Sequence, residues 1–408
     1  MISFPAVKVR IKIYPAILRK WTTFAVCGKK YNSYRLFNVY RPSAWRYLCH
    51  IKTSQEIANN IKIKNPLITS ILLLTLNTTI MAQQNNVQPA AQDPNIGKET
   101  RAFLEALNSG GGEPLETLSP AEARQVLVGA QASVNYDYSD IEETEKTITV
   151  DGQPLNIHIV KPKGAKAGLP VFMFFHGGGW VLGDYPTHKR LVRDLVVNSA
   201  AVAVFPDYTP SPEAQFPVPT NQAYGATKWV AEHGDEIGVD GSNLAVVGNS
   251  VGGNMAAVVA LMAKDKNGPK IKQQILLWPV TDSDFGRESY TKFAQERFLT
   301  TPLMQWMWDN YLPDVEARKH KYASPAQASL EALKDLPPAL IHVAENDILH
   351  DEGVAYGRKL DEAGVPTTVA EFKGFIHDYG MLNPLAHIPA VQSSIKQAAA
   401  VLKDALRK

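Results

Sequence analysis

The residue best placed to do chemistry is Ser250, which stands in the sequence Gly-Asn-Ser-Val-Gly. An apolar run at 244–247 precedes this motif, and a helix-like run at 254–261 follows it. A strand, then Gly-x-Ser-x-Gly, then a helix is the order of a nucleophile elbow, where a tight turn lifts the serine hydroxyl above the edge of a sheet. A side chain on either flanking glycine would clash between the strand and the helix. The N–H of Val251 then lies at a helix N-terminus, where it can hold an oxyanion.

A second glycine-rich stretch, of sequence His-Gly-Gly-Gly-Trp, follows the apolar run at 170–175. Three successive glycines leave their backbone N–H groups unshielded, and such groups can point at a developing negative charge without reorganising. Either motif alone also fits an ordinary glycine-rich loop, but finding both in one chain favours a hydrolytic site. We therefore predict an oxyanion hole formed by Gly177, Gly178, Gly179 and Val251.

Together these motifs resemble those of the α/β-hydrolases of the hormone-sensitive-lipase-like branch, which include the bacterial family IV esterases. The family pattern is His-Gly-Gly-Gly, then Gly-Asp-Ser-Ala-Gly-Gly, then an acid and a histidine further along the chain. The resemblance covers residues 98–408. Thr209 and Pro210 replace the family's usual Arg-Leu. Asn249 replaces the usual Asp before the serine, so we expect a changed local field and an intact turn.

A serine hydroxyl needs a histidine base, and that base needs an acid to fix its tautomer. In α/β-hydrolases they follow in the order Ser, acid, His. The resemblance implies Asp347 as the acid, in a stretch where Ile348 and His350 replace the family's Pro and Arg. We expect the nearby Asp351 to cap the following helix instead.

Several histidines follow Ser250 in the chain. The resemblance implies His377 as the base, because it lies in a loop between the last alternating strand and the final helix. His387 is the weaker alternative, and His342 lies inside a strand, where we expect a core residue. The implied reaction is acyl transfer from a small-molecule ester of short-to-medium chain length, with no metal and no organic cofactor.

The elements that must position these residues alternate between strands and helices, which implies a mostly parallel sheet covered on both faces. The fold class is thus α/β, an α/β-hydrolase fold. A hairpin is expected over 147–150 and 155–160, which alternate apolar and polar residues around a turn. Further strands are predicted at 170–175, 201–205, 244–247, 275–278, 339–343 and 367–372, and helices at 188–198, 221–233 and 391–406.

Two stretches that do not follow this alternation of strands and helices predict a helical cap, at about 98–130 and 283–325. Ser119, Pro120 and Glu122 form a helix start, with Ser at the N-cap and Glu at the third position. An insertion such as 283–325 would sit above the carboxyl ends of the strands, where ligands bind in open α/β sheets. We expect its Trp306, together with Trp180, to contact the substrate, although ordinary packing explains such aromatic residues as well.

The 408 residues are 45% hydrophobic and 20% charged, as in an ordinary globular protein. The net charge of +2 is unevenly spread, because residues 1–82 are strongly basic and the remainder is acidic. An acidic body is a poor candidate for nucleic-acid binding. The two cysteines lie in the first 82 residues, which excludes a thiolate nucleophile or cysteine metal site in the body.

Residues 61–82 predict a signal peptide, with Lys62 and Lys64 before an apolar core and cleavage after Ala82. We therefore expect export, to the periplasm or out of the cell. The alternative is a membrane anchor through 65–81, but this run is shorter than the ~20 residues that a span needs. Residues 83–97 are expected to form a flexible leader. The basic extension at 1–60 receives no fold: it is either upstream of the true start or a transit peptide.

Three function classes stay open at this point. A carboxylesterase leads, and an amidase or formamidase would use the same triad. A non-catalytic ligand-binding protein on a hydrolase scaffold is the third, although such a protein is expected to lack a triad residue. The sequence also leaves the oligomeric state open, with a homodimer as one alternative.

Overall fold

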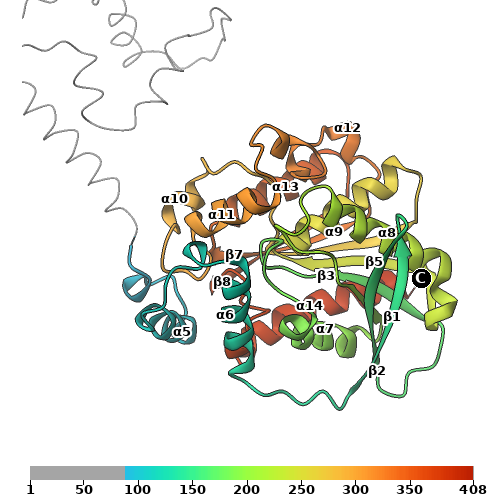
Figure 1. The fold of residues 1–408 in the computed structure, drawn as a ribbon, viewed down its shortest axis with the longest axis horizontal. Coiled ribbons are helices and arrows are strands. Elements are labelled where there is room, and N and C mark those ends of the chain that lie inside the picture. Colours follow the sequence, from blue (N-terminus) through green and yellow to red (C-terminus); the bar gives the residue numbers. More distant parts are fainter. Residues whose placement is uncertain (1–87, 408) are drawn as a thin grey trace, which may run out of the picture. The chain divides into compact units, whose positions relative to one another are not determined.

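The structure, a computed structural model, describes residues 88–407 (Figure 1). The predicted extension at 1–60, the signal peptide and the alternative anchor at 65–81 therefore lie outside the described residues. Within 88–407, no helix is both long enough and apolar enough to cross a membrane.

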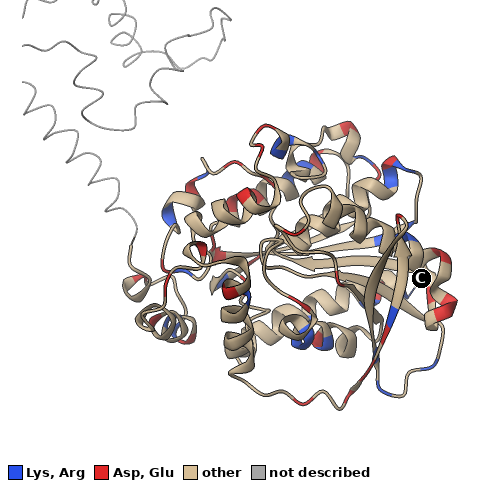
Figure 2. Ribbon diagram, viewed as in Figure 1, with Lys and Arg blue, Asp and Glu red and all other residues tan. Residues whose placement is uncertain are grey.

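A single eight-stranded sheet forms the centre of the fold, in the order β1-β2-β4-β3-β5-β6-β7-β8. From β4 to β8 all neighbouring strands are parallel, which confirms the predicted α/β-hydrolase fold. β3 and β4 carry no charged residue, because both of their faces are buried, and β3 is accordingly tan in Figure 2. The strands are β1 (Ile141–Val150), β2 (Gln153–Pro162), β3 (Leu169–Phe175), β4 (Val202–Pro206), β5 (Val239–Asn249), β6 (Ile271–Leu277), β7 (Ala339–Asn346) and β8 (Thr367–Ile376).

The predicted hairpin is present and longer than expected. β1 and β2 pair antiparallel along their full length, from Ile141 opposite Pro162 to Val150 opposite Gln153. β2 then pairs antiparallel with β4, which attaches the hairpin to the parallel part of the sheet.

Helices cover both faces of the sheet (Figure 1). α7 and α14 pack together on one face, and α8, α9 and α13 lie on the other. α9, which follows the proposed nucleophile, is buried from Val251 to Ala263, so it is fixed between the sheet and its neighbours. The helices are α5 (Lys98–Ser109), α6 (Pro120–Ala132), α7 (Tyr185–Ser199), α8 (Val218–His233), α9 (Val251–Asp265), α10 (Glu288–Lys292), α11 (Thr301–Tyr311), α12 (Leu330–Leu333), α13 (His350–Glu362) and α14 (Pro389–Leu406).

The two stretches predicted as a cap contain α5 and α6 in the first and α10 and α11 in the second. The predicted start of α6 is present: the Glu122 N–H donates to Ser119 Oγ, and the Ser119 N–H donates to Glu122 Oε2. This capping box satisfies two backbone donors that the first turn of a helix would otherwise leave unpaired.

The flexible leader predicted at 83–97 needs correction over its described part. Asp93 is buried and forms an ion pair with the buried Arg297 at 2.8 Å. The Ala90 N–H donates to Glu296. Ile96 forms an isolated parallel β-bridge with Gly374, near the end of β8. A buried ion pair that lost one partner would leave an unpaired charge, so these contacts hold residues 88–97 against the fold.

Candidate active site

Ser250 occupies a sharp turn between β5 and α9, with φ 56° and ψ −123°. The flanking glycines allow this turn, as the sequence predicted. A Cβ on Gly248 would lie 2.1 Å from the carbonyl oxygen of Gly252, and one on Gly252 would lie 1.9 Å from the carbonyl oxygen of Phe175. The strained backbone therefore places the Ser250 hydroxyl at the carboxyl end of β5.

Three strand ends bring Ser250, His377 and Asp347 together. Asp347 follows β7 and His377 follows β8, both at the same edge of the sheet as the end of β5. His377 Nε2 lies 2.9 Å from Ser250 Oγ, and His377 Nδ1 lies 2.7 Å from Asp347 Oδ2. The Leu349 N–H donates to Asp347 Oδ1 at 2.9 Å and fixes the carboxylate. All three side chains are buried, so water does not compete with these contacts.

The electrostatic surroundings of His377 favour its protonated form. Burial alone would lower the pKa of this imidazole, but the negative charges of Asp347 and Asp378 outweigh burial, and the pKa is raised. A base with a raised pKa accepts the serine proton more readily. The same base is charged, and so unable to act, in a wider acidic range.

The His-Gly-Gly-Gly loop lies directly beside Ser250. Gly178 and Gly179 adopt positive φ values of 104° and 65°, which glycine tolerates and most residues do not. Among the described residues, no acceptor within the protein is recorded for their N–H groups. Val251 begins α9, so its N–H has no intrahelical acceptor either.

Gly177 differs from the prediction. Its N–H donates to the Asn249 side-chain oxygen at 3.0 Å. This N–H group is therefore already hydrogen-bonded and is not free to act as an oxyanion donor. The reason is the residue before the nucleophile, whose side chain reaches back to the loop. The arrangement thus offers three backbone N–H groups near Ser250, from Gly178, Gly179 and Val251.

The two tryptophans predicted to contact the substrate have different surroundings. Trp180 is fully buried: its ring stacks on Tyr311 at 3.9 Å and meets Trp308 edge-on at 4.8 Å. Its surface is therefore covered by α11, and it packs the His-Gly-Gly-Gly loop against this helix. Trp306, on the same helix, is only partly buried and retains exposed surface.

The remaining histidines take no part in this cluster. His342 is buried within β7 and packs on Phe372, and burial lowers its pKa to about 3, as befits the predicted core residue. His387, the weaker alternative base, is exposed. His176 is stacked on Tyr208, and burial lowers its pKa to about 4, so it stays neutral.

Asp378 and Trp278 were not predicted from the sequence, yet both lie close to His377. Asp378 Oδ2 lies 3.7 Å from His377 Nε2, and Asp378 Oδ1 accepts from Trp278 Nε1 at 2.5 Å and from Asn249 Nδ2 at 2.8 Å. The signal available in the sequence was a charged residue directly after the predicted base. Its neighbours could not be foreseen, because they come from two other strands.

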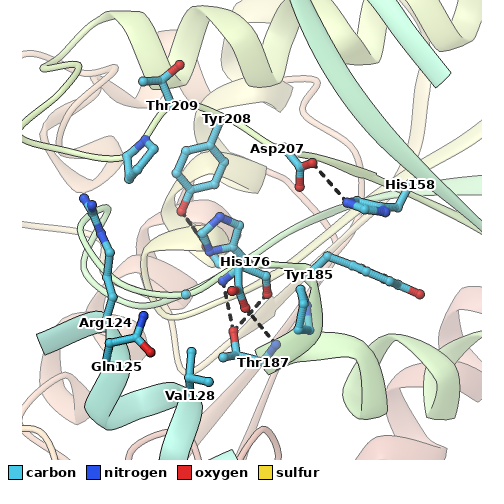
Figure 3. Close-up of a pocket in the computed structure, with 14 residues that line it drawn as sticks. Arg124, Gln125, Val128, His158, His176, Tyr185, Thr187, Asp207, Tyr208 and Thr209 are labelled. Atoms are coloured by element: carbon cyan, nitrogen blue, oxygen red, sulfur yellow. Dashed lines mark hydrogen bonds and ion pairs between the residues drawn. The ribbon is translucent and has the colours of Figure 1, made fainter. Parts of the chain in front are cut away.

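A separate hollow of about 560 Å³ is lined in part by His176, the first residue of the His-Gly-Gly-Gly loop (Figure 3). Two pairs of its lining side chains contact each other: His158 with Asp207, and Tyr208 with His176. Of the described residues, neither Ser250 nor His377 nor Asp347 lines it. No group of three His, Cys, Asp or Glu suited to a metal ion occurs within residues 88–407.

Comparisons with known proteins agree with this fold. A family model described as alpha/beta hydrolase fold matches residues 172–381. Carboxylesterase NlhH of Mycobacterium tuberculosis is 34% identical over 264 residues, which is 64% of this chain and 82% of that protein. Ethyl acetate hydrolase of Pseudomonas putida is 29% identical over 293 residues, covering 70% of this chain and 92% of that one.

Solved structures are similar along nearly their whole length. A thermostable esterase from Pseudomonas putida ECU1011 is 60% identical with a TM-score of 0.77, covering 78% of this chain and 99% of that chain. A fungal esterase from Rhizomucor miehei is 34% identical with a TM-score of 0.72, covering 76% and 97%.

The fold, the elbow and these relatives define a class, that of the α/β-hydrolases. The chain belongs to the hormone-sensitive-lipase-like family within it, as the sequence resemblance predicted. It is a carboxylesterase-type serine hydrolase.

Proposed function

We propose that the protein hydrolyses short acyl esters, with Ser250 as nucleophile, His377 as base and Asp347 as the acid that orients it. The observation that carries this proposal is the unbroken series of contacts from Ser250 Oγ through both ring nitrogens of His377 to Asp347. Each contact has the length of a hydrogen bond, which is the geometry that nucleophile activation requires.

In the first half of the reaction, Ser250 Oγ attacks the ester carbonyl carbon while its proton passes to His377 Nε2. Asp347 stabilises the imidazolium that forms. The proton then goes from His377 to the leaving alcohol as the carbon–oxygen bond of the ester breaks. In the second half, water attacks the acyl-enzyme, gives a proton to His377, and the acid leaves as Ser250 regains its proton.

The negative charge that develops on the carbonyl oxygen needs donors. We assign the N–H groups of Gly178, Gly179 and Val251, since Gly177 is engaged by Asn249. Each such donor contributes about 3–4 kcal/mol to the transition state in comparable sites.

Short acyl chains are supported by the tight aromatic packing around the loop, where Trp180, Trp308 and Tyr311 fill the space between α11 and the His-Gly-Gly-Gly loop. One relative, of which this chain matches 92%, is named ethyl acetate hydrolase. The partly exposed Trp306 is the residue of α11 that we assign to the substrate surface.

The test is hydrolysis by the full chain of p-nitrophenyl acetate, butyrate, octanoate and palmitate, and of p-nitroacetanilide, beside Ser250→Ala. We expect turnover that is highest for acetate or butyrate and lost in the variant. Turnover of the anilide at a rate near that of the esters would favour an amidase instead. Well-folded protein that cleaves no substrate would overturn the proposal and favour a binding role.

For location, we propose export with cleavage after Ala82, on the basis of the basic and apolar pattern of 61–82. N-terminal sequencing of protein purified from its native cells tests this. A mature chain that begins at Gln83 is expected, and one that retains 65–81 and partitions with membranes would contradict it.

A further inference from the structure

A buried carboxylate beside the proposed base has no part in the mechanism above. Asp378 is only 3% exposed, and one of its oxygens lies 3.7 Å from His377 Nε2, the nitrogen that faces Ser250. The base thus has a carboxylate on each side: Asp347 at Nδ1 and Asp378 at Nε2. At 3.7 Å the second is a close charge without the geometry of a strong hydrogen bond.

The position of Asp378 is fixed from two other strands. Trp278, the residue after β6, donates its indole N–H to Asp378 Oδ1 at 2.5 Å. Trp278 is itself buried, and its backbone N–H donates to the carbonyl of His342 at 2.7 Å. Asn249, at the end of β5, donates its side-chain N–H to the same oxygen at 2.8 Å. Two donors on one oxygen hold the other toward His377.

The orientation of the Asn249 amide follows from its second contact. Its oxygen accepts the Gly177 N–H at 3.0 Å, so its nitrogen must face Asp378. An aspartate at this position could still accept from Gly177. It would place a carboxylate oxygen at hydrogen-bond distance from the Asp378 carboxylate, and two like charges that close cannot both stay ionised.

We propose that Asp378 is a positioning residue that stabilises the protonated form of His377, and that Asn249 is the neutral partner which allows a carboxylate there. The inference rests on the proposed function, since it concerns the base of that reaction. When Ser250 Oγ attacks, its proton arrives at His377 Nε2, and the new positive charge then lies beside two anions.

The ionisable groups that face His377 come from three elements. Asp347 and Asp378 lie in the loops after β7 and β8, and their charges raise the pKa of His377 against the effect of burial. Glu352 of α13 faces the same histidine, but burial raises its own pKa to about 8, so it adds little charge in the acid range. His188, near Asn249, adds no charge, because burial lowers its pKa well below the usual value. Removal of Asp378 therefore leaves Asp347 as the main charge beside His377 and yields a measurable change.

The experiment is the pH profile of kcat/KM on p-nitrophenyl butyrate for the full chain, for Asp378→Asn, and for the matched control Asp335→Asn. Asp335 is exposed and lies before β7, at the amino end of that strand and so away from Ser250. Its φ of 58° is close to the 56° of Asp378. Asn tolerates this backbone conformation at both positions. We expect the acid limb of Asp378→Asn to move to lower pH by about one unit or more, and that of the control to stay.

A second pair of variants tests the partnership. Asn249→Asp should lower Tm and the rate at neutral pH, because it pairs two carboxylates. Asn249→Asp combined with Asp378→Asn should restore Tm, since the amide and carboxylate merely exchange places, and its acid limb should also lie below that of the wild type. This double variant serves as well if Asp378→Asn alone is too unstable to assay.

Acid limbs that coincide in wild type, Asp378→Asn and the double variant would overturn the inference, as would an Asn249→Asp protein as stable as the wild type. Ser250→Ala is assayed alongside. If it is inactive while the limbs coincide, only this inference fails; if it retains full activity, the proposed function fails first.

Discussion

The proposed catalytic edge and the predicted cap hold their side chains by different forces. At the catalytic edge, made of the loops after β5, β7 and β8, short polar side chains are fixed by hydrogen bonds such as those of Asp347 with His377 and Leu349. In the cap, α11 is fixed by ring packing: Tyr311 stacks on Trp180, and Trp308 lies edge-on to it.

The two kinds of contact tolerate different changes. Hydrogen bonds weaken steeply with distance and angle, so a small displacement at the catalytic edge removes the chemistry. Ring packing is less directional, so changes in the cap act mainly on stability and on substrate binding. Variants of the edge should therefore change kcat, and variants of the cap should change Tm or KM.

Two contacts between the regions lie close to the proposed site. Met307 of α11 lies against Gly179 of the loop, and Tyr290 of α10 donates to Glu352 of α13, just beyond Asp347. A substitution at either of these contacts can therefore affect both regions, and so change kcat as well as stability.

The largest effect is expected for His377→Ala. Without its base, Ser250 keeps its proton at neutral pH, and kcat should fall about 10⁶-fold while Tm changes little. Steady-state hydrolysis of p-nitrophenyl butyrate measures this. His387→Ala removes the exposed alternative histidine and serves as control; the assignment is wrong if that variant loses activity and His377→Ala does not.

Gly179→Ala should cause the next largest loss. Its Cβ would lie 2.1 Å from Met307 Sδ, and its φ of 65° disfavours any side chain, so the loop must move. A displaced oxyanion donor should lower kcat about 10²–10³-fold.

The combined Gly179→Ala, Met307→Ala variant should recover part of this loss, since it removes the steric clash and keeps the backbone strain. Gly112→Ala is the control, because nothing lies within 4 Å of its added Cβ. No recovery in the combined variant would show that α11 does not constrain the loop.

The buried Glu352, which accepts a hydrogen bond from Tyr290, should make the stability of the protein depend on pH. Burial raises its pKa from 4.5 to about 8, against the lowering effect of hydrogen bonds from Thr281, Tyr290 and Asp282. The native state then binds a proton that the unfolded state has released, so stability is full below pH 4.5 and falls as the pH rises through 8.

Glu352→Gln mimics the protonated acid and should flatten that fall, which is on the order of 1 kcal/mol per pH unit. Thermal melts from pH 5 to pH 9 measure it. The control is Glu362→Gln, on the exposed part of the same helix. Parallel curves for wild type and Glu352→Gln would contradict the prediction.

Tyr311→Phe should have the smallest effect. It removes the hydrogen bond to Thr220, of length 2.8 Å, and leaves the stack on Trp180 intact. We expect a loss of about 1 kcal/mol in the free energy of unfolding with kcat unchanged. A double-mutant cycle with Thr220→Val isolates the contribution of this hydrogen bond. A large fall in kcat in Tyr311→Phe would contradict the expectation that variants of the cap leave kcat unchanged.

The residues that sequence reasoning identified are those with strict local requirements. The elbow around Ser250 needs glycines because a Cβ would meet the backbone of Gly252 or Phe175, and such a requirement leaves a visible motif. The α6 start was predictable for the same reason, since its capping box spans four neighbouring residues. The parallel sheet followed from the apolar runs of strands buried on both faces.

The features that escaped prediction depend on contacts between distant residues. Gly177 and Asn249 are 72 positions apart, Asn249 and Asp378 are 129 apart, and Asp93 and Arg297 are 204 apart. None of these pairs has a local signature, so the engagement of Gly177, the contacts of Asp378 and the packing of residues 88–97 could not be foreseen. The burial of Trp180 under α11 belongs to the same class.

The most direct test of the central claim is covalent labelling of the nucleophile. Diethyl p-nitrophenyl phosphate transfers its phosphoryl group to an activated serine and releases p-nitrophenol. We expect one diethylphosphoryl group per chain, mapped by peptide mass spectrometry to Ser250, with activity lost in proportion and labelling slowed in His377→Ala. Full inactivation with the label on another residue, or with no label at all, would contradict the account.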